Sequence, residues 1–280
     1  MDMRLLIIGA GTICIFWLAA WTRLGLISEY SFFPLWAGYI VFINGLSEWF
    51  FRTSLLKRMG WTFIFLFVIS IPMWWFLEYM NSIVHNWHYV LSAPITAFHY
   101  EIQASINFST VIPAALSTAF FVFNCVRRDA LSLDKRSISS TAVAIAFVMS
   151  FIMFGLMAAL PNETFPLVWI IPLLFLEPLN YRFNADASFL RLVGQGDWTF
   201  PISIGLGTLT TGFWWECWNF YSLPKWIYTI PYVGFWKIFE MPFLGYFGYP
   251  FFGLIVFSYA SLLLFLVGSD NLVRLFYAPR

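Results

Sequence analysis

Two clusters of carboxylate, amide and aromatic side chains have the residue types and spacing that an acid–base site requires. The later cluster contains Glu216, Asn219, Trp226, Tyr228 and Glu240. The earlier cluster repeats it at a nearly constant offset with a single one-residue slip, and it contains Glu78, Asn81, Trp87, Tyr89 and Glu101. We interpret this agreement as an internal repeat, and it predicts that the chemistry of the protein is located there.

The four glutamates of the repeat are the candidate catalytic residues: Glu78, Glu101, Glu216 and Glu240. A carboxylate near the end of a membrane-spanning helix is costly unless it is paired or protonated. We therefore expect at least one neutral glutamic acid that can donate a proton. For Glu101 and Glu240 an alternative is a position at the start of a helix, where an acid interacts favourably with the helix dipole.

A second alternative for the clusters is a structural brace between a loop and a helix. Glu216 would then accept a hydrogen bond from Tyr228 or Trp226. In the earlier copy Glu78 would bond to Asn81 or Trp87. Both interpretations remain open from the sequence.

Aromatic residues surround these acids, in a chain that is 22% aromatic with 15 Trp, 13 Tyr and 34 Phe. Aromatic faces stabilise cations. An acid that protonates an alkene, beside rings that shield the resulting carbocation, is a physical arrangement for isoprenoid cyclisation, and it requires no metal and no other cofactor. The candidate substrate-binding residues are Trp87, Tyr89, Asn81, Trp215, Trp218, Asn219, Trp226 and Tyr228.

Three histidines in the first cluster region raise the alternative of a metal site. His85, His88 and His99 lie close to Glu101 in the sequence. The corresponding positions of the later copy carry Pro224, Ile227 and Ile238. Because these positions hold no metal ligand, the prediction is a protein without a metal.

The composition is that of an integral membrane protein. The chain is 61% hydrophobic and only 10% charged, against about 25% charged residues in soluble domains. The net charge of +1 gives no indication of a nucleic-acid partner. A spanning helix needs about 20 mostly apolar residues, and the segments that qualify are 4–22, 31–47, 61–80, 103–125, 141–160, 165–180, 200–219 and 238–267.

Basic residues support eight spans with both termini in the cytoplasm, because Lys and Arg are enriched on that side. With this topology twelve of the 15 Lys and Arg residues fall on the inner side. The outer side carries only Arg23, Lys225 and Lys237. We expect an all-α bundle of two parallel four-helix repeats, 1–128 and 129–280, related by a pseudo-twofold axis along the membrane normal.

The segments between the spans lead to two further expectations. The aromatic loops 81–103 and 220–237 contain almost no charge, so we expect them to fold back over the outer leaflet. Glu177 at the inner end of the sixth span is expected to form a salt bridge with Arg182 or Arg191.

The motifs Trp87-His88-Tyr89 with Glu101, and Trp226-Ile227-Tyr228 with Phe239-Glu240-Met241-Pro242, resemble the lycopene cyclase domain of membrane carotenoid cyclases. That family has two acids in a Pro-x-Glu-Glu stretch and three helices per domain, whereas this chain has one acid per motif and four spans per repeat. The resemblance implies a redox-neutral reaction on a carotenoid or other polyprenyl lipid, with Glu240 and Glu101 as acids. The chain also resembles uncharacterised bacterial multi-pass membrane proteins.

Two classes of function follow from these patterns. The first is an intramembrane acid–base enzyme, a cyclase or isomerase, that acts on a polyprenyl lipid near the outer leaflet. The alternative is a non-enzymatic protein for lipid or pigment binding, assembly or transport. The expected partners are membrane lipid or a polyprenyl substrate, with a homo-oligomer or a membrane complex as the assembly. The basic-inside loops favour the bacterial inner membrane.

Overall fold

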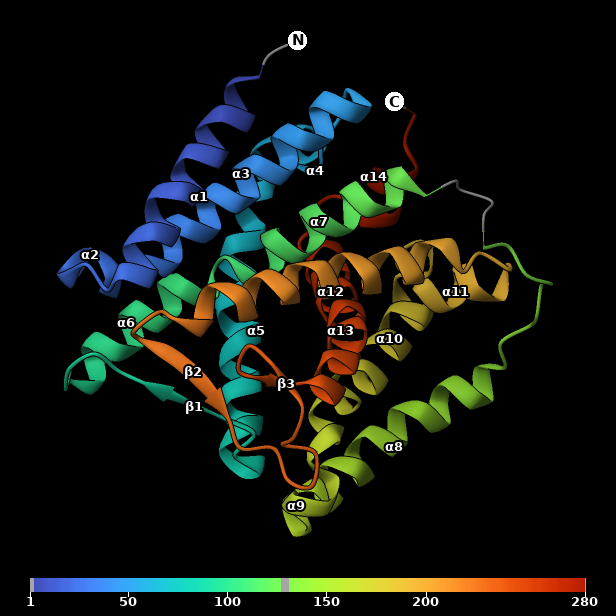
Figure 1. Cartoon of the computed structure of the whole chain (residues 1–280). Coiled ribbons are helices and arrows are strands. Elements are labelled where there is room, and N and C mark those ends of the chain that lie inside the picture. Colours follow the sequence, from blue (N-terminus) through green and yellow to red (C-terminus); the bar gives the residue numbers. More distant parts are fainter. Residues whose placement is uncertain (1–2, 127–130, 280) are drawn as a thin grey trace.

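The computed structural model describes residues 3–126 and 131–279, which form a predominantly helical protein (Figure 1). The predicted boundary between the two repeats, at residues 128 and 129, lies outside the described residues. The helices of the first part are α1 (Arg4–Thr22), α2 (Gly25–Glu29), α3 (Phe32–Phe51), α4 (Leu55–Met59), α5 (Phe63–Val84), α6 (Ala97–Phe108) and α7 (Val111–Cys125). Those of the second part are α8 (Ser140–Ala159), α9 (Pro161–Thr164), α10 (Ile171–Phe183), α11 (Phe189–Gly194), α12 (Thr199–Phe220), α13 (Gly248–Leu266) and α14 (Leu272–Tyr277).

Six helical segments of the described chain are long and apolar enough to cross a membrane. They are Arg4–Thr22, Leu55–Val84, Ala97–Cys125, Ser140–Ala159, Pro161–Phe183 and Phe243–Leu266. This confirms the helical class and favours a membrane protein. The expected eight spans also include α3 and α12, which have 20 and 22 residues. The buried polar residues of these two helices include Asn44 and Ser47 on α3 and Thr208 and Thr211 on α12.

Small residues allow the central helices to approach closely. Helix α12 crosses the middle of the molecule beside α7 and α13 (Figure 1). A Cβ atom on Gly207 of α12 would lie 2.4 Å from the Cα atom of Ala119 on α7. A Cβ atom on Gly9 of α1 would lie 2.5 Å from the backbone nitrogen of Phe42 on α3. Substitution at either glycine therefore requires the helices to separate.

Three of the expected spans are interrupted, each near a proline. The span expected at 165–180 begins with a 3₁₀ segment (Phe165–Trp169) before α10. The helix expected at 238–267 begins only at Gly248, near the Gly248-Tyr249-Pro250 break point, after the strands β3 (Lys237–Ile238) and β4 (Met241–Pro242) and a 3₁₀ segment (Phe243–Phe247). The span expected at 103–125 is divided between α6 and α7. Pro113 has no N–H group for an α-helical bond to the Ser109 carbonyl, which favours the break.

The two aromatic loops contain strands that pair with each other, which the expectation of purely helical structure omitted. Strand β1 (Trp87–Val90) is antiparallel to β2 (Lys225–Tyr228). Trp87 lies opposite Tyr228, and Tyr89 lies opposite Trp226. The repeat equates Trp87 with Trp226 and Tyr89 with Tyr228, so exchanging the two copies reproduces the same pairs.

Glu177 does not form the expected salt bridge. It is 2% exposed and accepts hydrogen bonds from the Ser188 hydroxyl (2.6 Å), the Leu190 backbone N–H (3.0 Å) and the Ser258 hydroxyl (2.8 Å). The Arg191 guanidinium instead donates to the Tyr181 carbonyl at 3.0 Å. Ser188, which caps the start of α11, and Leu190 in its first turn supply two of these donors, and Ser258 of α13 supplies the third, in place of a cation.

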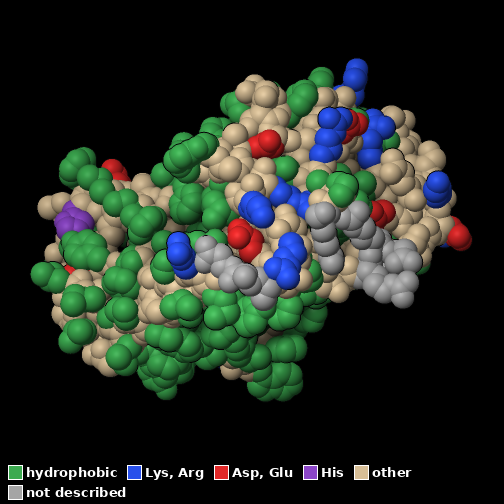
Figure 2. All heavy atoms as spheres, turned by 90° about the horizontal axis from the view of Figure 1, so that it is seen from above, with side chains coloured by type: hydrophobic (Ala, Val, Ile, Leu, Met, Phe, Trp, Pro, Cys, Tyr) green, Lys and Arg blue, Asp and Glu red, His purple; other side chains and the backbone are tan. Residues whose placement is uncertain are grey.

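Lys and Arg side chains gather on one face of the molecule (Figure 2). Both described ends of the chain and the short helices α4, α11 and α14 lie toward the upper part of Figure 1. From above, Lys and Arg side chains gather over one region, and a wide hydrophobic surface extends beside it (Figure 2). This arrangement is typical of a membrane protein with a basic end.

Candidate functional site

Glu216 is the most enclosed carboxylate among the predicted catalytic residues. It lies on α12 and is 0% exposed. Its Oε1 atom accepts hydrogen bonds from the Tyr228 hydroxyl (2.7 Å), the Tyr249 hydroxyl (2.7 Å) and the Trp226 indole Nε1 (3.4 Å). We call Glu216, Trp226, Tyr228 and Tyr249 the Glu216 cluster. Its three donors leave little capacity on Oε1 for a further partner.

The other carboxylate oxygen of Glu216 has a different environment. Oε2 is buried and has no hydrogen-bond partner among the described residues. Leaving a buried polar group unsatisfied costs about 1–3 kcal/mol. Such an atom therefore marks a position where a proton, a water molecule or a ligand group lowers the free energy.

Glu78 on α5 is held in the same manner. Its Oε1 atom accepts hydrogen bonds from the Tyr89 hydroxyl (2.6 Å), the Trp74 Nε1 (2.8 Å) and the Trp87 Nε1 (3.0 Å). We call Glu78, Trp74, Trp87 and Tyr89 the Glu78 cluster. Glu78 is half-buried, whereas Glu216 is fully enclosed.

The third donor differs between the two clusters for a steric reason. Trp74 supplies it in the Glu78 cluster, and the repeat places Gly212 at the corresponding position of α12. A Cβ atom on Gly212 would lie 2.6 Å from the Tyr249 ring. The absence of a side chain at Gly212 therefore makes room for Tyr249 of α13, whose hydroxyl replaces the missing indole.

The two asparagines of the repeat hold the strands that carry the aromatic donors. Asn81 Nδ2 donates to the Trp87 carbonyl at 2.9 Å, and its Oδ1 accepts from the Trp87 N–H at 3.2 Å. Asn219 makes the same two bonds to Trp226, at 2.7 and 2.8 Å. Both predicted substrate-binding asparagines thus use their amides to position a tryptophan. Of the two partners that the brace interpretation offered for Glu78, Trp87 bonds to it and Asn81 bonds to Trp87 instead.

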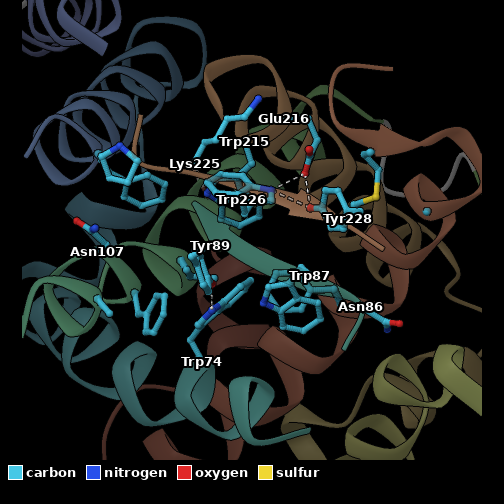
Figure 3. Close-up of a pocket in the computed structure, with 18 of the residues that line it drawn as sticks. Trp74, Asn86, Trp87, Tyr89, Asn107, Trp215, Glu216, Lys225, Trp226 and Tyr228 are labelled. Atoms are coloured by element: carbon cyan, nitrogen blue, oxygen red, sulfur yellow. Dashed lines mark hydrogen bonds between the residues drawn. The ribbon is translucent and has the colours of Figure 1, made fainter. Parts of the chain in front are cut away.

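A cavity of about 170 Å³ lies between the two clusters, and Figure 3 shows residues of both around it. Its wall is mainly aromatic and aliphatic. Glu216 and Lys225 are its charged members among the described residues. The aromatic lining residues are Phe32, Trp74, Trp87, Tyr89, Tyr100, Phe108, Trp169, Trp215, Trp226, Tyr228, Tyr249 and Phe252.

The remaining predicted acids occupy different surroundings. Glu240 lies in the turn between β3 and β4, not at the entry to a helix, and it forms an ion pair with Lys225. Glu101 is exposed on α6 and is absent from the cavity wall. Gln103 lines the cavity from the same helix, and a separation of two residues rotates a helical side chain by about 200°. Of the four glutamates, Glu216 lines the cavity, and Glu78 and Glu240 bond to residues that line it, whereas Glu101 is exposed.

The predicted tryptophans of α12 divide between the cavity and the core. Trp215 lines the cavity. Trp218 is 4% exposed and packs against Trp36 with ring centroids 4.8 Å apart. Trp218 therefore supports the helix packing behind the site.

Two of the three histidines bond to neutral partners. His99 Nε2 lies 2.9 Å from the Tyr30 hydroxyl, and His88 Nε2 lies 2.7 Å from the Thr229 hydroxyl. Within residues 3–126 and 131–279 there is no group of three or more His, Cys, Asp or Glu residues that could hold a metal ion.

The strand tyrosines are suited to remain hydrogen-bond donors. Burial, followed by the adjacent Glu78 charge, holds the pKa of Tyr89 well above its ordinary value. Burial and then Glu216 raise the pKa of Tyr228 in the same direction. Both phenols therefore stay protonated at neutral pH and keep donating to the carboxylates.

Comparisons with protein-family models, curated proteins and solved structures find no match to this chain. The function must therefore be argued from the site itself. Sequence reasoning missed Tyr249 and the lining residue Asn86, and it did not identify Trp74 as a donor to Glu78. The signal that the two clusters differ was Gly212, which stands at the repeat position corresponding to Trp74.

Proposed function

We propose that this protein is an intramembrane, redox-neutral acid–base enzyme of the cyclase or isomerase type, acting on a carotenoid or other polyprenyl lipid. The observation that carries the proposal is the Oε2 atom of Glu216, which is buried and unpartnered in a residue that lines an aromatic cavity. No redox cofactor takes part in the proposed reaction.

The hydrogen bonds of Glu216 define where its proton resides. Because Oε1 accepts three hydrogen bonds, the proton of the neutral acid lies on Oε2. Transfer of this proton to an alkene carbon uses the π electrons to form a C–H bond and leaves a carbocation. Attack by a second alkene forms a C–C bond, and loss of a proton to the Glu216 carboxylate restores a double bond. The product is an isomer of the substrate, and the acid is regenerated.

The cavity wall suits the charged intermediate. The indole and phenol rings of Trp215, Trp226 and Tyr249 lie in the same wall as Glu216. Aromatic rings stabilise a nearby cation by about 0.5–2 kcal/mol each, more strongly where water is excluded. The remainder of the wall is apolar, as expected for a hydrocarbon substrate.

The proposal includes an eight-span architecture of two parallel four-helix units, with both termini on the cytoplasmic side and the site near the outer leaflet. Similar contacts in the two units support it. In the first unit the Asn44 side chain bonds to the Ser117 hydroxyl and the Leu56 N–H. In the second unit the Glu177 carboxylate bonds to the Ser258 hydroxyl and the Leu190 N–H. The distribution of basic residues supports the orientation, and we place the protein in the bacterial inner membrane on that basis.

Identification of the lipid that accompanies the purified protein tests this function. The extracted lipids are identified by absorbance and mass spectrometry, and candidate polyprenyl lipids are then incubated with wild type and Glu216→Gln. We expect conversion to an isomer of unchanged mass by wild type and at least a hundredfold slower conversion by the variant. Equal conversion by both proteins excludes Glu216 as the acid.

A non-enzymatic lipid- or pigment-binding function is the second candidate, and one observation favours it. All three aromatic donors of each cluster bond to its own glutamate, which is the geometry of a brace. In that case the lipid is recovered unchanged from both proteins. A bound tetrapyrrole pigment would indicate an assembly function.

A further inference from the structure

The two charged residues of the cavity wall differ in their partners. The Lys225 ammonium, the cationic group of the wall in the described chain, is paired with Glu240 and also donates to the Phe220 carbonyl at 3.2 Å. Glu216 lies in the wall with no cation bonded to it. Its partners are phenols and an indole, which carry no charge. A cationic ligand therefore meets an acidic group without displacing an existing ion pair.

The unpartnered Oε2 atom of Glu216 and the aromatic wall both favour an alkylammonium group. Glu216 Oε2 is buried and unpartnered. An N–H group of a protonated amine satisfies such an oxygen through a charge-assisted hydrogen bond, which is stronger than a neutral one. The surrounding rings stabilise the alkyl groups and the positive charge of an alkylammonium ion.

We propose that the cavity binds an amine with an apolar chain, held as an ammonium–carboxylate pair with Glu216. A neutral amine that enters through the apolar wall takes the proton from Oε2, so that nitrogen gains the N–H bond and Glu216 becomes the carboxylate. This binding uses the cavity and Glu216 but does not depend on the cyclase reaction, and either proposal can fail while the other stands.

Ligand titrations on the purified full-length protein in dodecyl maltoside, an uncharged detergent, test this binding. The probes are N,N-dimethylhexylamine and its neutral counterpart hexanol, with binding measured by calorimetry and by the shift in melting temperature. We expect the amine to bind at least about tenfold more tightly than the alcohol. Equal affinities on wild type overturn the proposal, and this comparison requires no variant.

Two variants locate the binding. Glu216→Gln keeps the size of the side chain but removes the charge, and we expect it to abolish the preference for the amine. Glu163→Gln alters an exposed acid at the start of α9 and serves as the matched control. A preference that persists in Glu216→Gln contradicts the proposed site.

A third probe distinguishes the source of the amine. Lyso-phosphatidylethanolamine carries its ammonium group beside a phosphate, whereas dimethylhexylamine has no anionic group. Binding of both, each dependent on Glu216, identifies a lipid headgroup as a ligand. Binding of the simple amine alone identifies a free amine as the ligand.

Discussion

The two oxygens of Glu216 are the least equivalent pair of atoms in the candidate site. One accepts three hydrogen bonds from neighbouring rings, and the other is buried without a partner. Glu177, by contrast, uses both oxygens, with Ser188 bonded to one and Ser258 to the other. We infer that the three bonds hold Oε1 of Glu216 in place and leave Oε2 to carry the proton of the neutral acid.

Removal of one phenol donor tests how the fixed oxygen is held. Tyr249→Phe eliminates a buried hydrogen bond to Glu216 and leaves the ring in place. We expect a loss of about 1–3 kcal/mol in the free energy of unfolding, because hydrogen bonds to charged or buried acceptors are of this size. Tyr246→Phe, which removes a bond from an exposed hydroxyl to the Ile238 carbonyl, is the control and should change stability by less. Denaturation in detergent measures both, and equal losses would refute the assigned role of Tyr249.

At the residue scale the sequence predicted three of the four residues of each cluster. The bonds of Glu216 to Tyr228 and Trp226 were expected because these residues recur in both copies. The third donors were not, because they come from positions that are not equivalent: Trp74 lies on the same helix as Glu78, whereas Tyr249 comes from α13. Comparing the two copies identifies the donors that both share. It does not identify a donor that one copy takes from a different position.

The elements that build the site are three helices and two strands. Helices α5 and α12 carry the glutamates, β1 and β2 carry two aromatic donors each, and α5 and α13 carry the third donors Trp74 and Tyr249. The ladder connects loops from the two halves of the sequence, and the Thr229 N–H adds a bond to the Asn86 carbonyl at 3.0 Å. The site therefore depends on this inter-loop pairing as well as on helix packing.

Helix α12 lies close to Tyr249 of α13 at Gly212, and a small substitution at this glycine tests that approach. In Gly212→Ala the new Cβ atom lies 2.6 Å from the Tyr249 ring, so α12 and α13 must move or the ring must rotate. We expect a loss of at least about 1 kcal/mol in stability. Gly155→Ala on α8 is the matched control, since no atom lies within 4 Å of the new Cβ there, and the higher helix propensity of alanine should make it neutral or stabilising. Thermal unfolding of both variants, with no difference between them, would argue against the close approach.

The long apolar runs made the helices predictable, but the strands were not. Strands β1 and β2 have four residues each and pair across about half of the chain, so no local turn pattern marks them. The start of α13 was predictable only as a break near Pro250. Residues 237–242 form a short antiparallel pair instead of extending the helix.

At the scale of the molecule, the two halves meet around the cavity. The strand register is preserved when the copies are exchanged, and each strand carries donors to its own glutamate. Composition and the basic residues predicted a membrane protein with a repeat. They did not predict the cavity, since its wall comes from segments between Phe32 and Phe252 that only the complete fold brings together.

The proposed orientation leads to a labelling prediction. Lys57→Cys and Lys237→Cys, introduced separately into a background without Cys14, Cys125 and Cys217, place a thiol at exposed positions on opposite sides. We expect a membrane-impermeant maleimide to label Cys at position 237 in intact spheroplasts, and at position 57 only after permeabilisation. Labelling of both in intact spheroplasts, or the reverse order, would contradict the parallel eight-span arrangement.

The central claim is that Glu216 transfers a proton to carbon, and deuterium incorporation measures this most directly. The lipid recovered with the protein is returned to wild type and to Glu216→Gln in D₂O, and its isotopic composition is followed by mass spectrometry. The account predicts one solvent deuterium per newly formed C–H bond with wild type and none with the variant. A lipid that emerges without deuterium from wild type, or equally deuterated from both proteins, would contradict it.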